Sequence, residues 1–436
     1  MTTPATTPVT SSDDNSGIAP RRAALFLLDQ VTGQGKLMSE LLAGGALAHL
    51  PVEDRARAQR LAMATLRAMG RADRMLKPWL QKAPPLAVRN VLRLGTVEIA
   101  QGAAPHGVVN AMVEIMGLSQ RTAKLKGLVN AVLRRVGEAG PAGWEKLSVP
   151  HLPDWLRGPL VAAWGRKCVD AMEVAQFAGA PLDLSAKADA AIVALALGGI
   201  VLPTGSVRLR DAGQVSGLPG YAEGEWWVQD AAAALPVRVL DPRPDERVID
   251  LCAAPGGKTL QMAAAGAVVT ALDLSVARLA RVEANLARTG LIAEVVQGDA
   301  LNWVGGPFDA VLLDAPCSGT GTIRRHPDLP HAKDGAEFAG LIAQQGRMID
   351  HALSLLKPGG RLVYCTCSLL PDEGEVQVEA ALARHEGLRV DRDAVNRPGI
   401  DPAWITPEGG LRLRPDYWPE LGGMDGFYIA CLRRDV

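Results

Sequence analysis

The chain has 436 residues, of which 48% are hydrophobic and 21% are charged, and its formal net charge is −1. One hydrophobic core rarely organises a chain of this length, so we expect two or three domains. No apolar run approaches the roughly 20 residues that a membrane-spanning helix needs, and the first twenty residues show neither a basic start nor an apolar segment. We therefore expect a cytoplasmic protein with no membrane contact.

The six cysteines do not form the pattern of a disulfide framework or of a zinc site. They are scattered over the chain, at Cys168, Cys252, Cys317, Cys365, Cys367 and Cys431. Cys365 and Cys367 are separated by one residue, whereas zinc ligands usually lie two to four residues apart with a second pair downstream. We expect free thiols, no metal and, in the absence of any sign of an oligomer, a monomer.

The small net charge conceals an uneven distribution. Residues 21–140 contain 18 Lys or Arg and 8 Asp or Glu, whereas residues 141–436 carry a net charge of −9. Any single arginine of the first part can be explained as part of a solvated helix face. A surplus of ten positive charges in one segment, however, indicates contact with a polyanion such as RNA.

The first part of the chain predicts a short tail followed by a helical bundle. Residues 1–18 are rich in Thr, Pro, Ser and Asp, and we expect them to be disordered. Residues 19–140 show helical spacing of apolar residues, for example at Val88, Val91, Leu92 and Ile99. This segment predicts an all-helical, basic, RNA-binding domain.

Residues 141–225 read as a connecting subdomain, helical at first and later forming short strands near residues 201–209. Trp144, Trp155 and Trp164 are spaced through it. Tryptophans at such positions serve more often as core anchors than as stacking platforms for bases, and we interpret them as core.

From Trp226 to the C-terminus the pattern changes to short apolar strands alternating with helices. The strand-like runs include residues 248–251, 268–272, 295–296, 310–313, 362–364 and 426–432. Strands that alternate with helices in this way predict a doubly wound, Rossmann-like α/β sheet. The fold class is therefore multidomain, with a helical bundle, a connector and an α/β domain over residues 226–436.

The first of these strands leads into a glycine-containing loop, DLCAAPGGKT, at residues 250–259. Small residues allow a backbone to approach a ligand at the carboxyl end of a strand. The loop has neither the dinucleotide GxGxxG spacing nor that of a phosphate-binding P-loop. By itself it is compatible with either a ligand loop or a tight turn.

We expect two acidic residues, Asp273 and Asp299, to end the next two strands. Asp273 is placed to accept hydrogen bonds from ribose hydroxyls, and Asp299 to face an adenine edge. Each alone could be a strand-end cap. Together with the glycine loop, and without a basic phosphate clamp, they favour an adenosyl ligand.

The fourth and fifth strands end in DAPCSGTG and YCTCS, which place Cys317 and Cys367 at neighbouring strand ends. A thiolate that adds to carbon 6 of cytosine makes carbon 5 nucleophilic, and a second thiol can assist removal of the carbon 5 proton. Asp314 could bind the amino and ring-nitrogen edge of the base. The pair of thiols beside a nucleoside pocket thus predicts methylation of cytosine.

These motifs, together with RRHPD and the late GGMDGFY, resemble the Nop/Sun family of RNA cytosine-5 methyltransferases over residues 226–432. The resemblance implies that Cys367 is the nucleophile, that Cys317 assists product release and that Asp314 lies at the cytosine. It implies S-adenosylmethionine as the cofactor. The cofactor-binding residues that it implies are Cys252, Ala253, Ala254, Pro255, Gly256, Gly257, Lys258, Asp273, Asp299 and Asp314.

The segments NVLRLGTVEIA and KLKGLVNAVLRRV, at residues 90–100 and 124–136, resemble the antitermination factor NusB. A NusB-like domain fused to this catalytic domain is the arrangement of the Sun, or RsmB, enzymes, whose substrate is 16S ribosomal RNA. Transfer RNA as the substrate, or a non-catalytic role in ribosome assembly, remain as alternatives. A DNA enzyme is disfavoured, because its nucleophile usually lies in the Pro-Cys motif and the second cysteine here favours RNA.

The chain departs from the family pattern in three places. Cys365 stands where another small residue is usual, and residues 329–331 lack the aromatic residue often found after RRHPD. Residues 181–187 are not arginine-rich. The last two departures concern the contacts with RNA, whereas the two cysteines of the catalytic motifs are present.

Overall fold

A computed structural model describes residues 17–210 and 213–434, so that all but the last two residues of the expected tail lie outside the described part. The described chain forms two compact units. One consists of residues up to 153 together with His326–Lys333, and the other of residues from 154 onward without that insertion. Among the described residues, no helix is both long and apolar enough to cross a membrane.

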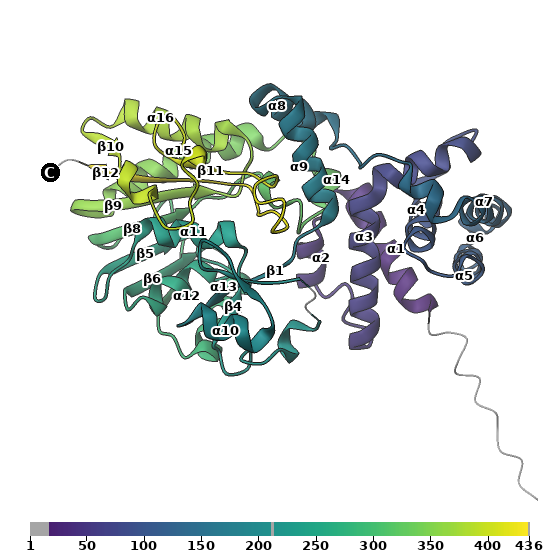
Figure 1. The fold of residues 1–436 in the computed structure, drawn as a ribbon, viewed down its shortest axis with the longest axis horizontal. Helices are drawn as coiled ribbons and strands as arrows, with labels where there is room; N and C mark the ends of the chain where they lie inside the picture. The colour runs from purple at the N-terminus through teal and green to yellow at the C-terminus, as the bar shows by residue number, and fades with distance from the viewer. Residues whose placement is uncertain (1–16, 211–212, 435–436) are drawn as a thin grey trace, which may run out of the picture. The chain divides into compact units, whose positions relative to one another are not determined.

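The first unit is entirely helical, which confirms the fold predicted for this part (Figure 1). Ile18, assigned above to the tail, is buried and is the first residue of α1. The main helices are α1 (Ile18–Gln34), α2 (Met38–Ala43), α3 (Val52–Leu76), α4 (Leu86–Ala100), α5 (Pro105–Gly117), α6 (Gln120–Ala123) and α7 (Lys126–Glu145). They enclose one apolar core, to which α1, α3, α4, α5 and α7 contribute, for example, Leu28, Leu66, Leu92, Met112 and Leu133.

A segment from the second half of the sequence is part of this helical unit. It contains α14 (Leu329–Ala332), and Asp328 Oδ2 accepts a hydrogen bond of 2.9 Å from the backbone N–H of Met38, at the first residue of α2. The ring Nε2 of His331 lies 3.0 Å from the carbonyl oxygen of Leu66. The residues that follow RRHPD are therefore built into the helical unit through buried polar contacts.

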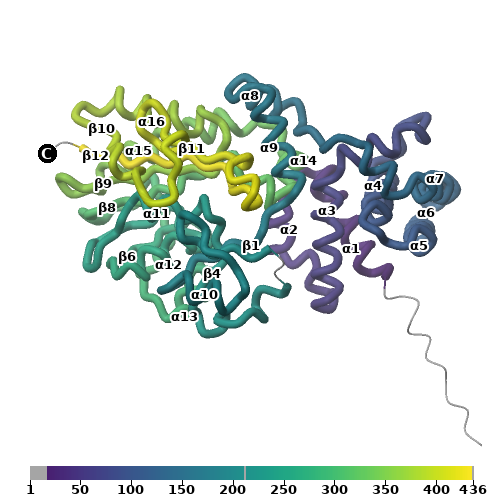
Figure 2. The backbone as a smooth tube through the Cα atoms, viewed as in Figure 1, coloured from purple at the N-terminus to yellow at the C-terminus, as the bar shows by residue number. Residues whose placement is uncertain are grey.

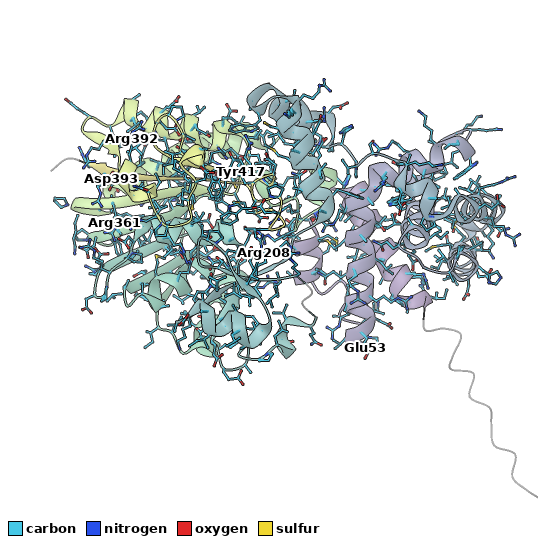
Figure 3. The ribbon with its side chains drawn as sticks, viewed as in Figure 1. Glu53, Arg208, Arg361, Arg392, Asp393 and Tyr417 are labelled. Atoms are coloured by element: carbon cyan, nitrogen blue, oxygen red, sulfur yellow. The ribbon has the colours of Figure 1, made fainter. Side chains whose placement is uncertain are left out.

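The second unit begins with α8 (Asp154–Trp164) and α9 (Arg166–Ala178) and continues into a small antiparallel sheet of order β2-β3-β1-β4. Its elements are β1 (Leu182–Ala186), α10 (Ala190–Leu197), β2 (Ile200–Val201), β3 (Val207–Leu209) and β4 (Trp226–Val228). Arg208, labelled in Figure 3, is buried and donates two hydrogen bonds of 2.6 Å to the carboxylate of Asp183. The short strands near residue 201 were expected, but β1 and β4 were not.

The large sheet of this unit has the order β10-β12-β9-β8-β5-β6-β7, with β11 paired to β12. Strands β5 to β9 are parallel to one another, and β12 is antiparallel to β9. The strands are β5 (Arg247–Leu251), β6 (Val268–Asp273), β7 (Glu294–Gln297), β8 (Phe308–Asp314), β9 (Leu356–Thr366), β10 (Leu388–Val390), β11 (Leu411–Leu413) and β12 (Phe427–Arg434). This confirms the α/β prediction.

Helices cover both faces of the sheet, as Figures 1 and 2 show. They are α11 (Ala231–Leu240), α12 (Gly257–Ala264), α13 (Val276–Thr289), α15 (Phe338–Ser354) and α16 (Glu375–Arg384). α11 and α12 pack in one core with Val248 and Leu312, whereas α15 and α16 pack in another with Ile249 and Leu313. Successive residues of a strand point to opposite faces of the sheet, and here helices cover both faces. Both sets of residues are therefore buried, and the strands appear in the sequence as continuous apolar runs.

Candidate active site

The loop after β5 is shaped by left-handed backbone at Cys252, with a φ of 65°, and at Gly256, with a φ of 103°. A Cβ atom on Gly256 would lie 3.2 Å from a side-chain atom of Val282, so the position has little room for a side chain. The backbone N–H of Ala254 donates to Asp273 Oδ2 at 3.1 Å. Asp273, at the end of β6, therefore holds the loop in place. The Asp273 carboxylate also lies at the strand end where a ligand is expected.

Asp299 lies two residues beyond β7 rather than at its end. Its carboxylate accepts hydrogen bonds from the backbone N–H of Leu301 at 2.9 Å and from the side chain of Asn302 at 2.7 Å. Local side-chain to backbone bonds of this kind cap turns. In this structure Asp299 stabilises the turn that follows the strand.

Asp250 was read from the sequence only as the start of the loop motif, but it is a fully buried acid beneath the loop. Thr259 donates to its Oδ2 at 2.5 Å, and Oδ1 has no hydrogen-bond partner among the described residues. Burial raises the pKa of Asp250 to about 7. The signal that could have revealed it is an acidic residue inside a continuous apolar strand.

The only basic residue of the loop, Lys258, is paired with the acid at the end of β8. Lys258 Nζ lies 2.8 Å from Asp314 Oδ2, and the thiol of Cys365 donates to Asp314 Oδ1 at 3.5 Å. Burial alone would lower the pKa of Lys258, but Asp314 raises it overall, so Lys258 is charged. Cys365 is buried, and its hydrogen bond helps to fix the position of the Asp314 carboxylate.

The two cysteines of the motifs lie side by side. Cys317 Sγ and Cys367 Sγ are 3.4 Å apart although fifty residues separate them in the sequence. The hydrogen bond with Cys367, together with burial, raises the pKa of the Cys317 thiol. The structure thus brings together the pair expected at neighbouring strand ends, close enough to exchange a proton.

Gly321 is part of the contact that holds these two motifs together. Its N–H donates to the carbonyl oxygen of Cys367 at 2.9 Å, and its own carbonyl accepts from the N–H of Gly426 at 2.8 Å. A Cβ atom at Gly321 would lie 2.0 Å from the Gly426 oxygen. Position 321 therefore has no room for a side chain, because the segments of Gly321, Cys367 and Gly426 meet there.

A buried cluster of charges lies in the adjoining segments, and sequence reasoning assigned it no role. Arg324 is fully buried and pairs with Asp230 at 3.1 Å and with Asp425 at 3.5 Å. Arg325 donates from Nε to Asp425 Oδ2 at 2.7 Å. The two arginines and Asp425 belong to the motifs RRHPD and GGMDGFY, which are visible in the sequence. Their pairing is not visible there, because a hundred positions separate Arg325 from Asp425.

A polar cavity of about 450 Å³ lies elsewhere, at the amino-terminal edge of β8 and β9. Arg361 and Asp393 line it and are labelled in Figure 3. Its charges are largely paired, for example Arg361 with Glu246 and Lys357 with Asp309. Neither Cys317 nor Cys367 lines this cavity.

The chain is similar to known proteins over most of its length. The family model described as 16S rRNA methyltransferase RsmB/F matches residues 237–433. A protein named ribosomal RNA small subunit methyltransferase B from Pseudomonas putida is 37% identical, over 95% of this chain and 98% of its own length. A protein of the same name from Pseudomonas syringae pv. tomato is 36% identical, over 95% and 96%.

The chain belongs to this methyltransferase family. It is therefore an enzyme that transfers a methyl group. The NusB family model matches residues 18–138, which confirms that the helical domain is NusB-like. The solved structure of PH0851 superposes with a TM-score of 0.74 over 96% of this chain and 99% of its own, and at 22% identity it supports the fold.

Proposed function

We propose that this enzyme uses S-adenosylmethionine to methylate carbon 5 of a cytosine in small-subunit ribosomal RNA, through a covalent bond between Cys367 and carbon 6. The observation that carries the chemistry is the 3.4 Å separation of Cys317 Sγ and Cys367 Sγ beside Asp314. The names of the relatives, ribosomal RNA small subunit methyltransferase B, support the substrate.

The residues of the loop after β5 fit an adenosyl cofactor. Gly256 and Gly257 have no side chain at positions where a Cβ atom would crowd Val282 and Gln229, and the buried Asp273 offers carboxylate lone pairs at the same strand end. Lys258 is paired with Asp314 and so does not act as a free phosphate clamp. We assign binding to Cys252 through Lys258, Asp273, Asp299 and Asp314. When bound, S-adenosylmethionine supplies an electrophilic methyl group.

The remaining chemistry belongs to residues of this chain. Cys367, once deprotonated, adds to carbon 6, which makes carbon 5 electron-rich enough to accept a methyl group. Asp314, whose side chain is about 29% exposed, is placed to accept hydrogen bonds from the cytosine edge, with its charge balanced by Lys258. This contact holds the base in position for the attack of Cys367 on carbon 6.

Release requires the carbon 5 proton to leave, the 5,6 double bond to re-form and the bond between carbon 6 and Cys367 Sγ to break. Cys317 is next to that sulfur, and we assign it to this step. The target base must be unstacked, because carbon 6 cannot be reached inside a helix. The basic residues of the NusB-like domain, residues 19–140, are assigned to RNA binding, and residues 141–225 connect them to the catalytic residues 226–436.

The test is a map of 5-methylcytosine in total RNA from cells with the gene, without it, and with the Cys367→Ala variant restored. Loss of one site in small-subunit ribosomal RNA that only the unaltered chain restores would support the proposal. Loss of a site in transfer RNA instead would change the substrate. Restoration of the site by Cys367→Ala would reject Cys367 as the nucleophile.

A further inference from the structure

Glu373 is a fully buried carboxylate that contacts Ser318, the residue after Cys317, and the mechanism above gives it no role. It ends the short 3-10 helix Pro371–Glu373, six residues after Cys367. Three donors converge on its carboxylate. They are the backbone N–H of Ser318 at 2.9 Å, the hydroxyl of Ser318, and Gln345 Nε2 at 3.1 Å. The side chain therefore holds the residue next to Cys317.

The main chain of the same residue holds the other cysteine's strand. The carbonyl oxygen of Glu373 accepts hydrogen bonds from the hydroxyls of Tyr364, at 2.8 Å, and Thr366, at 2.9 Å. Thr366 directly precedes Cys367 at the end of β9. Glu373 thus bonds to both catalytic segments, to one through its side chain and to the other through its backbone.

Resting on the function proposed above, we propose that Glu373 is a positioning residue whose carboxylate holds Cys317 against Cys367 for the release of methylated RNA. Substitution of its side chain removes the grip on Ser318 and leaves the carbonyl contacts with β9 in place. The nucleophile keeps its position, whereas the segment of Cys317 keeps its contacts with Thr320, Ser368 and Gln345 but is held less firmly. The expected defect is therefore in release and not in formation of the covalent bond.

The balance of the release step shows why the position of Cys317 matters. The carbon 5 proton passes to Cys317 Sγ as the thiol proton of Cys317 passes to the departing Cys367 Sγ, and the electrons of the C–H bond form the 5,6 double bond. The electrons of the bond between carbon 6 and sulfur return to Cys367. A displacement of about 1 Å in such a proton transfer costs on the order of 100-fold in rate.

Glu373→Gln is the sharpest test, because the amide has nearly the same shape as the carboxylate. A carboxylate accepts all three bonds, whereas an amide has one acceptor oxygen and turns its NH₂ group toward a donor. Glu379→Gln, on the exposed face of α16, is the matched control, since it removes the same charge from the same part of the chain. Ser318→Ala is a second variant that removes one of the three donors and leaves Glu373 intact.

The measurement is a single-turnover reaction with S-adenosylmethionine labelled in its methyl group, in the full-length protein. Label in RNA and label in the denaturation-resistant protein–RNA adduct are followed over time. We expect Glu373→Gln to form the adduct at nearly the normal rate and to release it roughly 10- to 100-fold more slowly. Ser318→Ala should show the same defect to a smaller degree, and Glu379→Gln should behave as the unaltered enzyme.

Equal losses in adduct formation and release in Glu373→Gln would overturn the positioning role, as would release at the normal rate. Cys317→Ala serves as the reference for a trapped adduct, and Cys367→Ala as the reference for none. If Cys317→Ala traps no adduct while RNA is still methylated, the proposed mechanism itself fails and this inference fails with it. If Cys317→Ala traps the adduct and Glu373→Gln does not, only this inference fails.

Discussion

Lys258 Nζ lies 2.8 Å from Asp314 Oδ2 and so joins the glycine loop after β5 to the strand that leads to Cys317. The two side chains are only 11% and 29% exposed. In the proposed function, one of these residues contacts the cofactor and the other the base. The ion pair therefore couples the two binding sites through residues that are 56 positions apart.

Lys258→Met should weaken both cofactor binding and methyl transfer and lower the free energy of unfolding by about 2 kcal/mol, because it leaves the Asp314 charge partly buried and unpaired. The control is Lys357→Met, which breaks the pair between Lys357 on β9 and Asp309 on β8, the strand of Asp314. The two atoms lie 2.7 Å apart, but the side chains are 38% and 29% exposed. Urea denaturation should show a loss below about 1 kcal/mol there. Equal losses in the two variants would contradict a special role for Lys258.

Cys367→Ala should reduce methyl transfer by roughly 10⁴-fold or more, because it removes the nucleophile of the proposed covalent step. Cofactor affinity, measured by calorimetry, should change little, since Cys367 is not among the residues assigned to the cofactor. Activity within tenfold of normal would reject Cys367 as the nucleophile.

Cys317→Ala should leave adduct formation possible and block its resolution. The expected result is an enzyme–RNA complex that survives denaturing electrophoresis and contains about one RNA per protein. The same gel run with Cys317→Ala/Cys367→Ala should show no complex. Rapid turnover by the single variant would remove Cys317 from the release step.

Asp250→Asn should stabilise the protein at alkaline pH. The folded-state pKa of Asp250 is raised from 3.8 to about 7, so its contribution to stability is fully present below pH 3.8 and is lost as the pH rises through about 7. Since one pKa unit corresponds to about 1.4 kcal/mol, the loss above pH 7 is on the order of 4 kcal/mol. Denaturant midpoints at pH 6 and pH 8.5 should therefore differ less in the variant than in the unaltered protein.

His331 should make the helical unit less stable in acid. Burial lowers the folded-state pKa of His331 below 6.5, so the unfolded chain binds a proton more readily. The stability contributed by neutral His331 is present above pH 6.5 and is lost as the pH falls toward the lowered folded-state value. His331→Gln should flatten the pH dependence of the unfolding midpoint between pH 7.5 and 5, and an unchanged slope would show that other groups dominate.

Much of the site could be predicted because its residues lie in short, contiguous motifs at strand ends. Cys317, Cys367 and Asp314 follow apolar runs that can only be buried strands, and parallel strands place their carboxyl ends at one edge of the sheet. Asp299 was harder to place, because a residue two positions past a strand can turn toward solvent, ligand or its own backbone. Here it bonds to Leu301 and Asn302.

The sequence by itself determined the α/β class, the helical first part and the choice of the residues proposed to react, because apolar periodicity and motif order are local properties. Tertiary structure alone decided the partners of Glu373, Asp250 and Arg324, and placed His326–Lys333 in the helical unit. A buried charge is tolerated only where other segments supply its hydrogen bonds. The local sequence around the charged residue does not predict which segments these are.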